Sequence, residues 1–177
     1  MSILETERDR KILFDSLLES LRSGSELERE DASYTLSELG TCQPADLIPH
    51  LQDDNGKVRE NTVRALGTIG DPVAKPCLIE ALKDSCWQVQ GQSIIALRRI
   101  DFSMLDQVLL ALEQTPHEWV VFCLLDWIAA SDQVADEKSK EFLHRVVDNE
   151  DYSEGIRSRA LAILRETQQG GWAQCKC

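Results

Sequence analysis

The residues of this chain that could bind a metal or act as a nucleophile are few and widely separated. The histidines are His50, His117 and His144, and none is spaced with a cysteine or an acid as metal ligands are. The six cysteines follow neither a disulfide framework nor a zinc-binding spacing. Cys175 and Cys177 flank a lysine, but two thiols do not close a metal site. The sequence therefore predicts no catalytic residue, no metal and no cofactor.

Composition excludes several classes of partner. The chain has 177 residues and a net charge of −12. An acidic surface repels nucleic-acid phosphates and acidic lipid headgroups, so we expect neither nucleic acid nor membrane as a partner. The N-terminus has no apolar signal region, and no apolar run is long enough to span a bilayer. These features predict an acidic, cytoplasmic protein.

The clearest pattern is an internal repeat with a period of about 30 residues. Equivalent apolar positions in the middle of the chain lie 31 residues apart: Leu51 and Leu82, Val58 and Val89, Leu66 and Leu97, and Ile69 and Ile100. A helix pair of this length cannot bury its own apolar face, so neighbouring pairs must stack into one core. The pattern predicts an all-α fold, a right-handed α-solenoid of about five helix pairs.

The chain divides into five such repeats. Their approximate bounds are 10–40, 41–70, 71–101, 102–130 and 131–167. We expect one domain over 1–167, and a flexible tail with incidental cysteines over 168–177.

Proline and glycine predict where helices are interrupted. Pro49 and Pro76 fall inside short first helices, which should be kinked or begin late. Gly40, Gly67 and Gly70 stand where a helix end requires a left-handed residue.

The second repeat resembles a known family. Its key positions are Leu47, Leu51, Asp53, Val58, Arg59, Ala65, Leu66 and the run from Ile69 through Gly70 and Asp71 to Pro72. This pattern is similar to the HEAT-like repeats named after phycobilisome bilin lyases. The third repeat fits nearly as well, whereas the fourth fits in spacing only. The resemblance therefore implies a HEAT-like solenoid.

In that family an arginine after each turn pairs with a turn aspartate, which forms a ladder between repeats. The matching arginines are Arg29, Arg59 and Arg157, and the matching acids are Asp53, Asp54 and Asp84. The third and fourth repeats carry Gln90 and Val120 instead. The resemblance thus implies a structural ladder that is interrupted in the middle of the chain.

A related HEAT-like family, the deoxyhypusine hydroxylases, binds two irons through repeated His-Glu pairs. The only such pair in this chain is His117-Glu118, and it begins about one helical turn before the family's position. One pair cannot hold a di-iron centre, so we do not expect this activity.

The second helices of the repeats predict a binding face. In a two-layer solenoid they line the concave side, and the fourth one is apolar from Trp119 to Ile128 except at Asp126. The predicted partner-binding residues are Tyr34, Arg64, Ile95, Val121, Phe122, Leu125 and Arg159. Alternatively, the apolar helix is covered core or mediates self-association. Trp87 and Trp119 are either rim anchors or packing between repeats.

These observations favour a non-enzymatic scaffold or adaptor that holds a peptide or helix of a partner protein on its concave face. The alternative, which the resemblance implies, is a subunit of a bilin lyase or a related phycobilisome protein. Such a subunit would handle a bilin tetrapyrrole as its cofactor and would act with a partner subunit. We expect a protein partner in either case, in a hetero- or homodimer.

Overall fold

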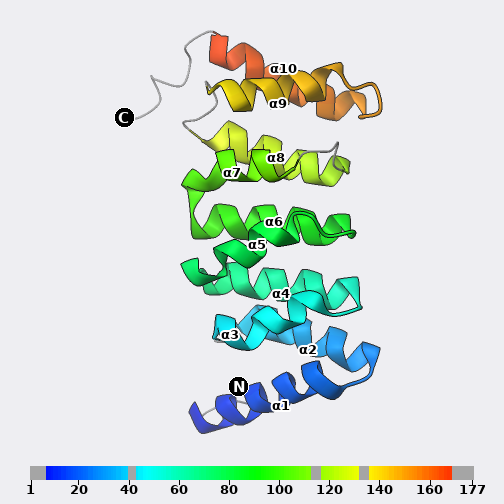
Figure 1. The fold of residues 1–177 in the computed structure, drawn as a ribbon, viewed down its shortest axis with the longest axis vertical. Helices are drawn as coiled ribbons and strands as arrows, with labels where there is room; N and C mark the ends of the chain where they lie inside the picture. The colour runs from blue at the N-terminus through cyan, green and yellow to red at the C-terminus, as the bar shows by residue number, and fades with distance from the viewer. Residues whose placement is uncertain (1–6, 40–42, 113–116, 132–135, 169–177) are drawn as a thin grey trace, which may run out of the picture. The chain divides into compact units, whose positions relative to one another are not determined.

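The described part of the protein is helical throughout. The computed structural model describes residues 7–39, 43–112, 117–131 and 136–168, and every regular element in these ranges is an α-helix or a 3-10 helix (Figure 1). Gly40 and residues 169–177, which include Cys175 and Cys177, lie outside the described residues. The predicted flexible tail therefore stays a prediction. None of the described helices is long and apolar enough to cross a membrane.

The helices form two compact units, Met1–Ile100 and Asp101–Cys177. The division falls at the boundary between the third and fourth predicted repeats. The described residues contain all five predicted helix pairs, three in unit 1 and two in unit 2, which confirms the predicted architecture. A single domain over 1–167 stays a prediction.

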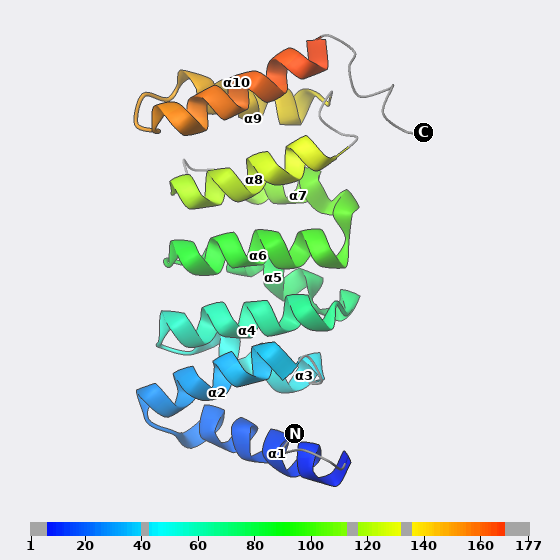
Figure 2. The same cartoon turned by 180° about the vertical axis from the view of Figure 1, so that it is seen from behind.

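Unit 1 consists of three stacked helix pairs. Its elements are α1 (Glu7–Ser23), α2 (Glu26–Leu39), α3 (Pro44–Leu47), η1 (Ile48–Gln52), α4 (Gly56–Ile69), η2 (Pro72–Ala74), α5 (Lys75–Ala81) and α6 (Trp87–Ile100). The second helices α2, α4 and α6 pack side by side and face the viewer in Figure 2, whereas α3 and α5 face the viewer in Figure 1.

Unit 2 repeats this arrangement with two pairs. Its elements are η3 (Phe102–Met104), α7 (Leu105–Ala111), α8 (Glu118–Ala130), α9 (Glu137–Asp148) and α10 (Glu154–Gln168). The first helices α7 and α9 contact each other, and so do the second helices α8 and α10.

The core of unit 1 follows the repeat period. Leu36, Leu66 and Leu97 occupy equivalent positions of α2, α4 and α6, and all three are fully buried. Thr62 and Ser93 stand where the HEAT-like pattern has alanine, and each hydroxyl donates to the carbonyl four residues earlier, at 2.8 Å. Both buried hydroxyls are therefore satisfied, which removes the main cost of burying them.

The two prolines shape the first helices as predicted. Pro49 lies in the first turn of η1, because α3 ends at Leu47 and the chain continues as a 3-10 helix. Pro76 lies in the first turn of α5, which begins only at Lys75. The missing N–H of each proline falls where no intrahelical partner is required.

The glycines behave differently from one another. Gly70 ends α4 in the left-handed conformation, with φ of 74°, as predicted. The same prediction is wrong for Gly67, which lies inside α4. A Cβ at Gly67 would lie 2.6 Å from the Cβ of Ala96 and 2.8 Å from its Cα. Gly67 is therefore required because α4 and α6 approach closely there.

We predict that Gly67→Ala destabilises unit 1 by about 1–3 kcal/mol, since the added methyl must push the α6 backbone away. Urea unfolding followed by circular dichroism measures this loss. The matched control is Gly155→Ala in α10, where an added Cβ meets nothing within 4 Å. The control should be neutral or up to about 1 kcal/mol more stable, because alanine favours helix. If the two substitutions change the unfolding free energy equally, the close approach of α4 and α6 does not require glycine at position 67.

Candidate functional site

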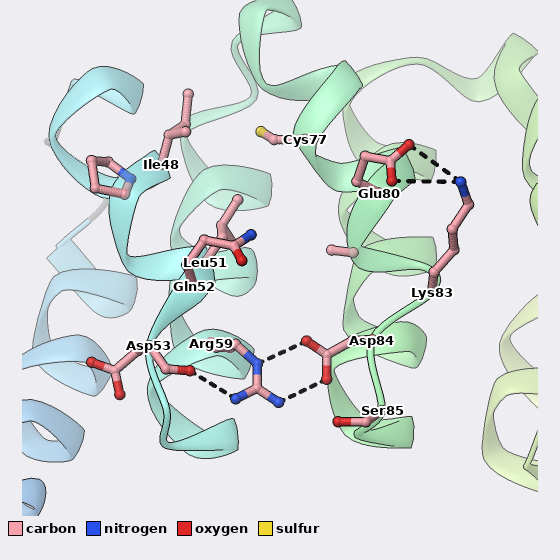
Figure 3. Close-up of a pocket in the computed structure, with 12 residues that line it drawn as sticks. Ile48, Leu51, Gln52, Asp53, Arg59, Cys77, Glu80, Lys83, Asp84 and Ser85 are labelled. Carbon is pink, nitrogen blue, oxygen red and sulfur yellow. Dashed lines mark hydrogen bonds and ion pairs between the residues drawn. The ribbon is translucent and has the colours of Figure 1, made fainter.

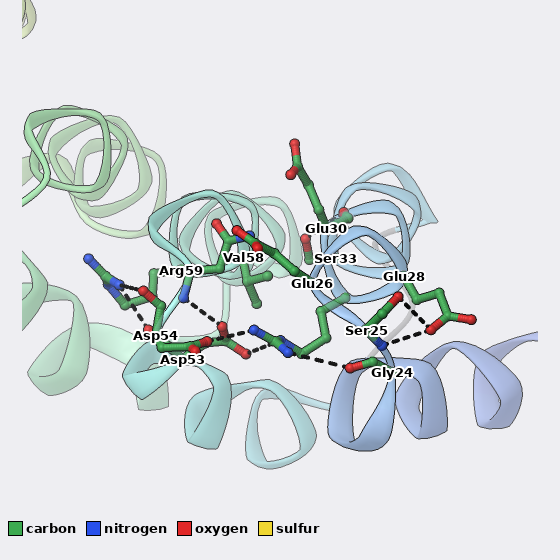
Figure 4. A network of polar contacts seen from close by, with 12 residues as sticks. Gly24, Ser25, Glu26, Glu28, Glu30, Ser33, Asp53, Asp54, Val58 and Arg59 are labelled. Atoms are coloured by element: carbon green, nitrogen blue, oxygen red, sulfur yellow. Dashed lines mark hydrogen bonds and ion pairs between the residues drawn. The ribbon is translucent and has the colours of Figure 1, made fainter.

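The first ladder contact in unit 1 joins α2 to the turn before α4 (Figure 4). The Nε of Arg29 lies 3.0 Å from Oδ2 of Asp53, an ion pair without hydrogen-bond geometry. Its Nη2 donates to Oδ1 of Asp54 at 2.6 Å. The interaction with the neighbouring Asp53 side chain, followed by the charge of Arg29, lowers the pKa of Asp54. Arg29 thus holds the two acids of the next turn.

Arg59 makes the second and more complete contact (Figure 3). Its Nε and Nη2 donate to the two carboxylate oxygens of Asp84 at 2.7 and 2.8 Å. Its Nη1 donates to the backbone carbonyls of Asp53 and Asp54 at 2.8 and 3.2 Å. The hydrogen bonds with Asp84 raise the pKa of Arg59, although burial acts against them. One guanidinium therefore connects its own turn to the next one.

The structure also explains the interruption of the ladder. Gln90 replaces arginine in α6, and its Nε2 donates to the backbone carbonyl of Asp84 at 2.6 Å. Gln90 therefore keeps the contact with its own turn. It lacks the guanidinium group with which Arg59 also binds the aspartate of the next turn. Val120 is fully buried. The Nε of Arg157 is buried without a hydrogen-bond partner among the described residues, and the ladder role of Arg157 stays a prediction.

Unit 2 connects its second helices by a different contact. A carboxylate oxygen of Glu118, in the first turn of α8, accepts the backbone N–H of Ser153, just before α10. The backbone and side-chain hydrogen bonds from Ser153 lower the pKa of Glu118. In unit 1, Glu26 likewise accepts the side-chain amide of Asn55, just before α4, at 3.2 Å. Sequence reasoning missed both contacts, since a glutamate in a first helical turn is common.

The predicted binding face is wrong at two positions. Val121 and Leu125 are 0% exposed, so both are core residues of α8 and present no surface. Neither can therefore contact a partner in this structure. Ile95 is half-buried in α6 and stays a prediction.

The remaining four predicted residues form two pairs, one in each unit. In unit 1 the guanidinium of Arg64 lies over the ring of Tyr34, 5.7 Å from its centroid, and Tyr34 is 52% exposed. The Nη2 of Arg64 also donates to Oδ1 of Asn61 at 3.0 Å and to Glu60 at 3.4 Å. The arginine is therefore held in place by an aromatic ring, an amide and a carboxylate.

In unit 2 the guanidinium of Arg159 lies over the ring of Phe122, 5.2 Å from its centroid, and pairs with Asp126. Phe122 also stacks with Trp119, with ring centroids 5.8 Å apart and an interplanar angle of 16°. Trp119 remains 43% exposed. Its ring therefore packs within its own helix and also forms part of the surface.

The sequence separations within the two aromatic–arginine pairs follow the repeat spacing. Tyr34 and Arg64 lie 30 residues apart, and Phe122 and Arg159 lie 37 apart. Each arginine thus occupies the same register position as its aromatic partner, one repeat later. We call the surfaces that carry these pairs, on α2 and α4 and on α8 and α10, the second-helix faces.

The opposite, first-helix side of unit 1 has a groove of about 720 Å³ (Figure 3). Ile48, Leu51 and Cys77 line it, and Arg59 and Asp84 stand at one end. Burial raises the pKa of the Cys77 thiol, and its Sγ donates to the carbonyl of Ala74 at 2.9 Å. A protonated thiol is a poor nucleophile, so the Cys77 thiol is not activated for attack.

One of the three histidines, His117, has a structural role. His117 caps α8, since its Nδ1 accepts the backbone N–H of Trp119 at 3.2 Å. Within the described ranges, no group of three or more histidines, cysteines and acids lies close enough to hold a metal ion.

We predict that Arg59→Ala destabilises the protein by about 3 kcal/mol, because it leaves Asp84 buried without its cation. The side chains of Arg59 and Asp84 are only 14% and 12% exposed, so solvent screens the pair weakly. Arg59→Gln also removes the cation beside Asp84, but it should cost less than Arg59→Ala, since a glutamine can keep the carbonyl contact that Gln90 makes. Urea unfolding measures both losses.

The matched control for Arg59 is Lys83→Ala. Lys83 pairs with Glu80 on the exposed surface at 3.3 Å, and such pairs contribute less than about 1 kcal/mol. If Arg59→Ala is as stable as Lys83→Ala, the pair does not hold the repeats together.

The lowered pKa of Glu118 predicts how the stability of the protein changes at acid pH. Because its pKa is lowered in the folded state, its stabilisation is present above the unfolded pKa of about 4.3 and is lost as pH falls through the folded value. Glu118→Gln removes this dependence, so its unfolding free energy should fall less steeply than that of the wild type below about pH 5. Urea unfolding at several pH values tests this, with the exposed Glu150→Gln as control. Parallel curves for Glu118→Gln and wild type would contradict it.

Comparison with known proteins agrees with this geometry. A sequence profile of HEAT repeats matches residues 44–122. None of the curated protein sequences compared with the chain matches it significantly.

Several solved structures share the fold. One is the complex of CpcE and CpcF of phycocyanin lyase from Nostoc sp. PCC7120, with a TM-score of 0.62 and 19% identity over 88% of this chain. This chain spans 65% of the length of that one. Another is a designed armadillo repeat protein in complex with the peptide (KR)4, with a TM-score of 0.56 and 15% identity, covering 92% of this chain and 87% of the other. The described helix pairs and these likenesses together identify the fold as a HEAT-like α-solenoid.

Proposed function

We propose that this chain is a non-catalytic scaffold that holds a segment of a partner protein against its second-helix faces, in the cytoplasm. The binding residues are Tyr34, Arg64, Ile95, Phe122 and Arg159. Val121 and Leu125 are left out because they are core residues. The arginines and aspartates of the ladder have the structural role of spacing the repeats that present this surface.

The observation that carries the proposal is the two aromatic–arginine stacks, in which Tyr34 and Arg159 are exposed and Phe122 and Arg64 are half-buried. Aromatic and arginine side chains are enriched among the residues that dominate binding energy in interfaces. Arg64 and Arg159 are each held by a ring and a carboxylate, so little side-chain freedom remains to be lost on binding.

The shared fold supports a protein partner in general terms. Of the similar structures, one is a complex of two proteins and another is a complex with a peptide. Stacked helical repeats offer an extended surface of regularly spaced positions, which suits a linear segment.

The alternative proposal is a subunit of a bilin lyase or related phycobilisome protein that acts with a partner subunit. The likeness to the CpcE and CpcF complex favours it, although this chain spans only 65% of that one. A bilin-handling protein should absorb visible light when it is produced together with tetrapyrrole synthesis. A scaffold without a bilin should stay colourless.

The test of the scaffold is a pull-down from extract of the source cells, followed by reconstitution with the purified partner. We expect the double variants Phe122→Ala with Arg159→Ala, or Tyr34→Ala with Arg64→Ala, to raise the Kd by at least about thirtyfold, the effect of losing a hot-spot side chain. Isothermal titration calorimetry measures the Kd.

Two further variants make the result interpretable. Ile12→Ser changes an exposed apolar residue of α1 and should leave the Kd unchanged. Leu125→Asp places a charge in the core and should unfold the protein, so it is unsuitable as a surface probe. If both folded double variants bind the partner as tightly as Ile12→Ser, the second-helix faces are not the binding site.

A further inference from the structure

The surface of unit 2 presents an aromatic platform, which consists of Trp119 and Phe122. The two rings stack, and the guanidinium of Arg159 already lies over Phe122. Trp119 is the part of the platform that remains accessible, at 43% exposure. Indole is the aromatic side chain that attracts a cation most strongly. The platform can therefore accept a positive group over Trp119.

An acidic turn lies beside this platform. The turn comprises residues 149–154, and Glu118, the neighbour of Trp119, accepts the backbone N–H of Ser153 from it. The buried side chain of Tyr152 anchors the turn, and burial raises the pKa of Tyr152 to about 12. The contact with Glu118 therefore fixes the turn against the first turn of α8, where Trp119 lies.

The charges around the platform are mainly negative. Helix α8 and the segment 149–159 contain five acidic and two basic side chains, and Arg145 of α9 is a further basic group near Tyr152. Of the two basic ones, Arg159 pairs with Asp126, and the Nε of Arg157 is buried. Glu150, Asp151 and Glu154 are exposed. The local field therefore adds to that of the whole chain, with its net charge of −12, in attracting cations.

We propose that the aromatic platform binds a segment of a partner protein that contains lysine or arginine. One cationic group of the segment lies over the indole of Trp119, and neighbouring basic groups face the acidic turn. This inference rests on the proposed scaffold function and names the chemistry of its partner. An acidic segment would meet the same carboxylates with like charge, and such contacts are repulsive.

The test uses the full chain and three octapeptides: alternating lysine and arginine, glutamate only, and glycine with serine. We expect only the basic peptide to bind, to shift the indole N–H resonance of Trp119 in an NMR titration, and to bind less tightly as salt increases. Trp119→Ala should weaken binding about 5- to 30-fold, the range of a desolvated cation–π contact. Trp119→Phe should weaken it less, because phenylalanine keeps a weaker π-face.

The matched control is Trp87→Ala, which removes another exposed tryptophan at a helix start, in unit 1, and should leave binding unchanged. Asp151→Lys reverses one charge of the acidic turn and should weaken binding even if Trp119→Ala does not fold. Equal binding of the glutamate peptide, or full binding by folded Trp119→Ala, overturns the inference. If the partner is captured as the scaffold proposal expects but the basic peptide does not bind, this inference fails and the proposed function stands.

Discussion

The guanidinium of Arg59 connects two consecutive turns of unit 1, and the stacking of the second helices depends on that connection. It donates to the carbonyls of its own turn and to both carboxylate oxygens of Asp84 in the next. Asp84 in turn accepts the backbone N–H of Cys86, the residue just before α6. The spacing of α4 and α6 is tight enough that only glycine fits at position 67. The Arg59–Asp84 contact near the start of α4 holds the two helices together, and Gly67 near its end permits their close approach.

Unit 2 achieves the same kind of connection with different chemistry. Glu118 accepts from the N-terminus of α10, and Lys138 of α9 pairs with Asp106 of α7 at 3.1 Å. The indole Nε1 of Trp127 donates to the carbonyl of Phe102 at 3.2 Å, which joins α8 to the start of the unit. A repeat fold requires that the turns be fixed, and several polar contacts can supply this. The ladder residues can therefore be absent from a repeat that keeps its helix pair.

The sequence predicted the parts of the structure that follow a period or a backbone rule. Repeat spacing located the helix pairs, and Pro49, Pro76 and Gly70 marked interruptions that the structure confirms. The exposed side of α8 could not be predicted, because a helix with apolar residues all round has no polar face to mark its orientation. Val121 and Leu125 were therefore placed on the surface by register alone. Packing against neighbouring helices determines which residues of α8 are buried, and this packing cannot be read from a single sequence.

The repeat register nevertheless predicted the residues of the two aromatic–arginine pairs as surface residues, and there is a physical reason for this agreement. In both pairs the arginine lies over a ring that occupies the equivalent position of the neighbouring second helix. The pairing is thus a property of stacking rather than of either residue. A surface built in this way holds its charged groups in fixed positions before any partner arrives, which lowers the entropic cost of binding. The same stacking that stabilises the core therefore also preorganises the second-helix faces.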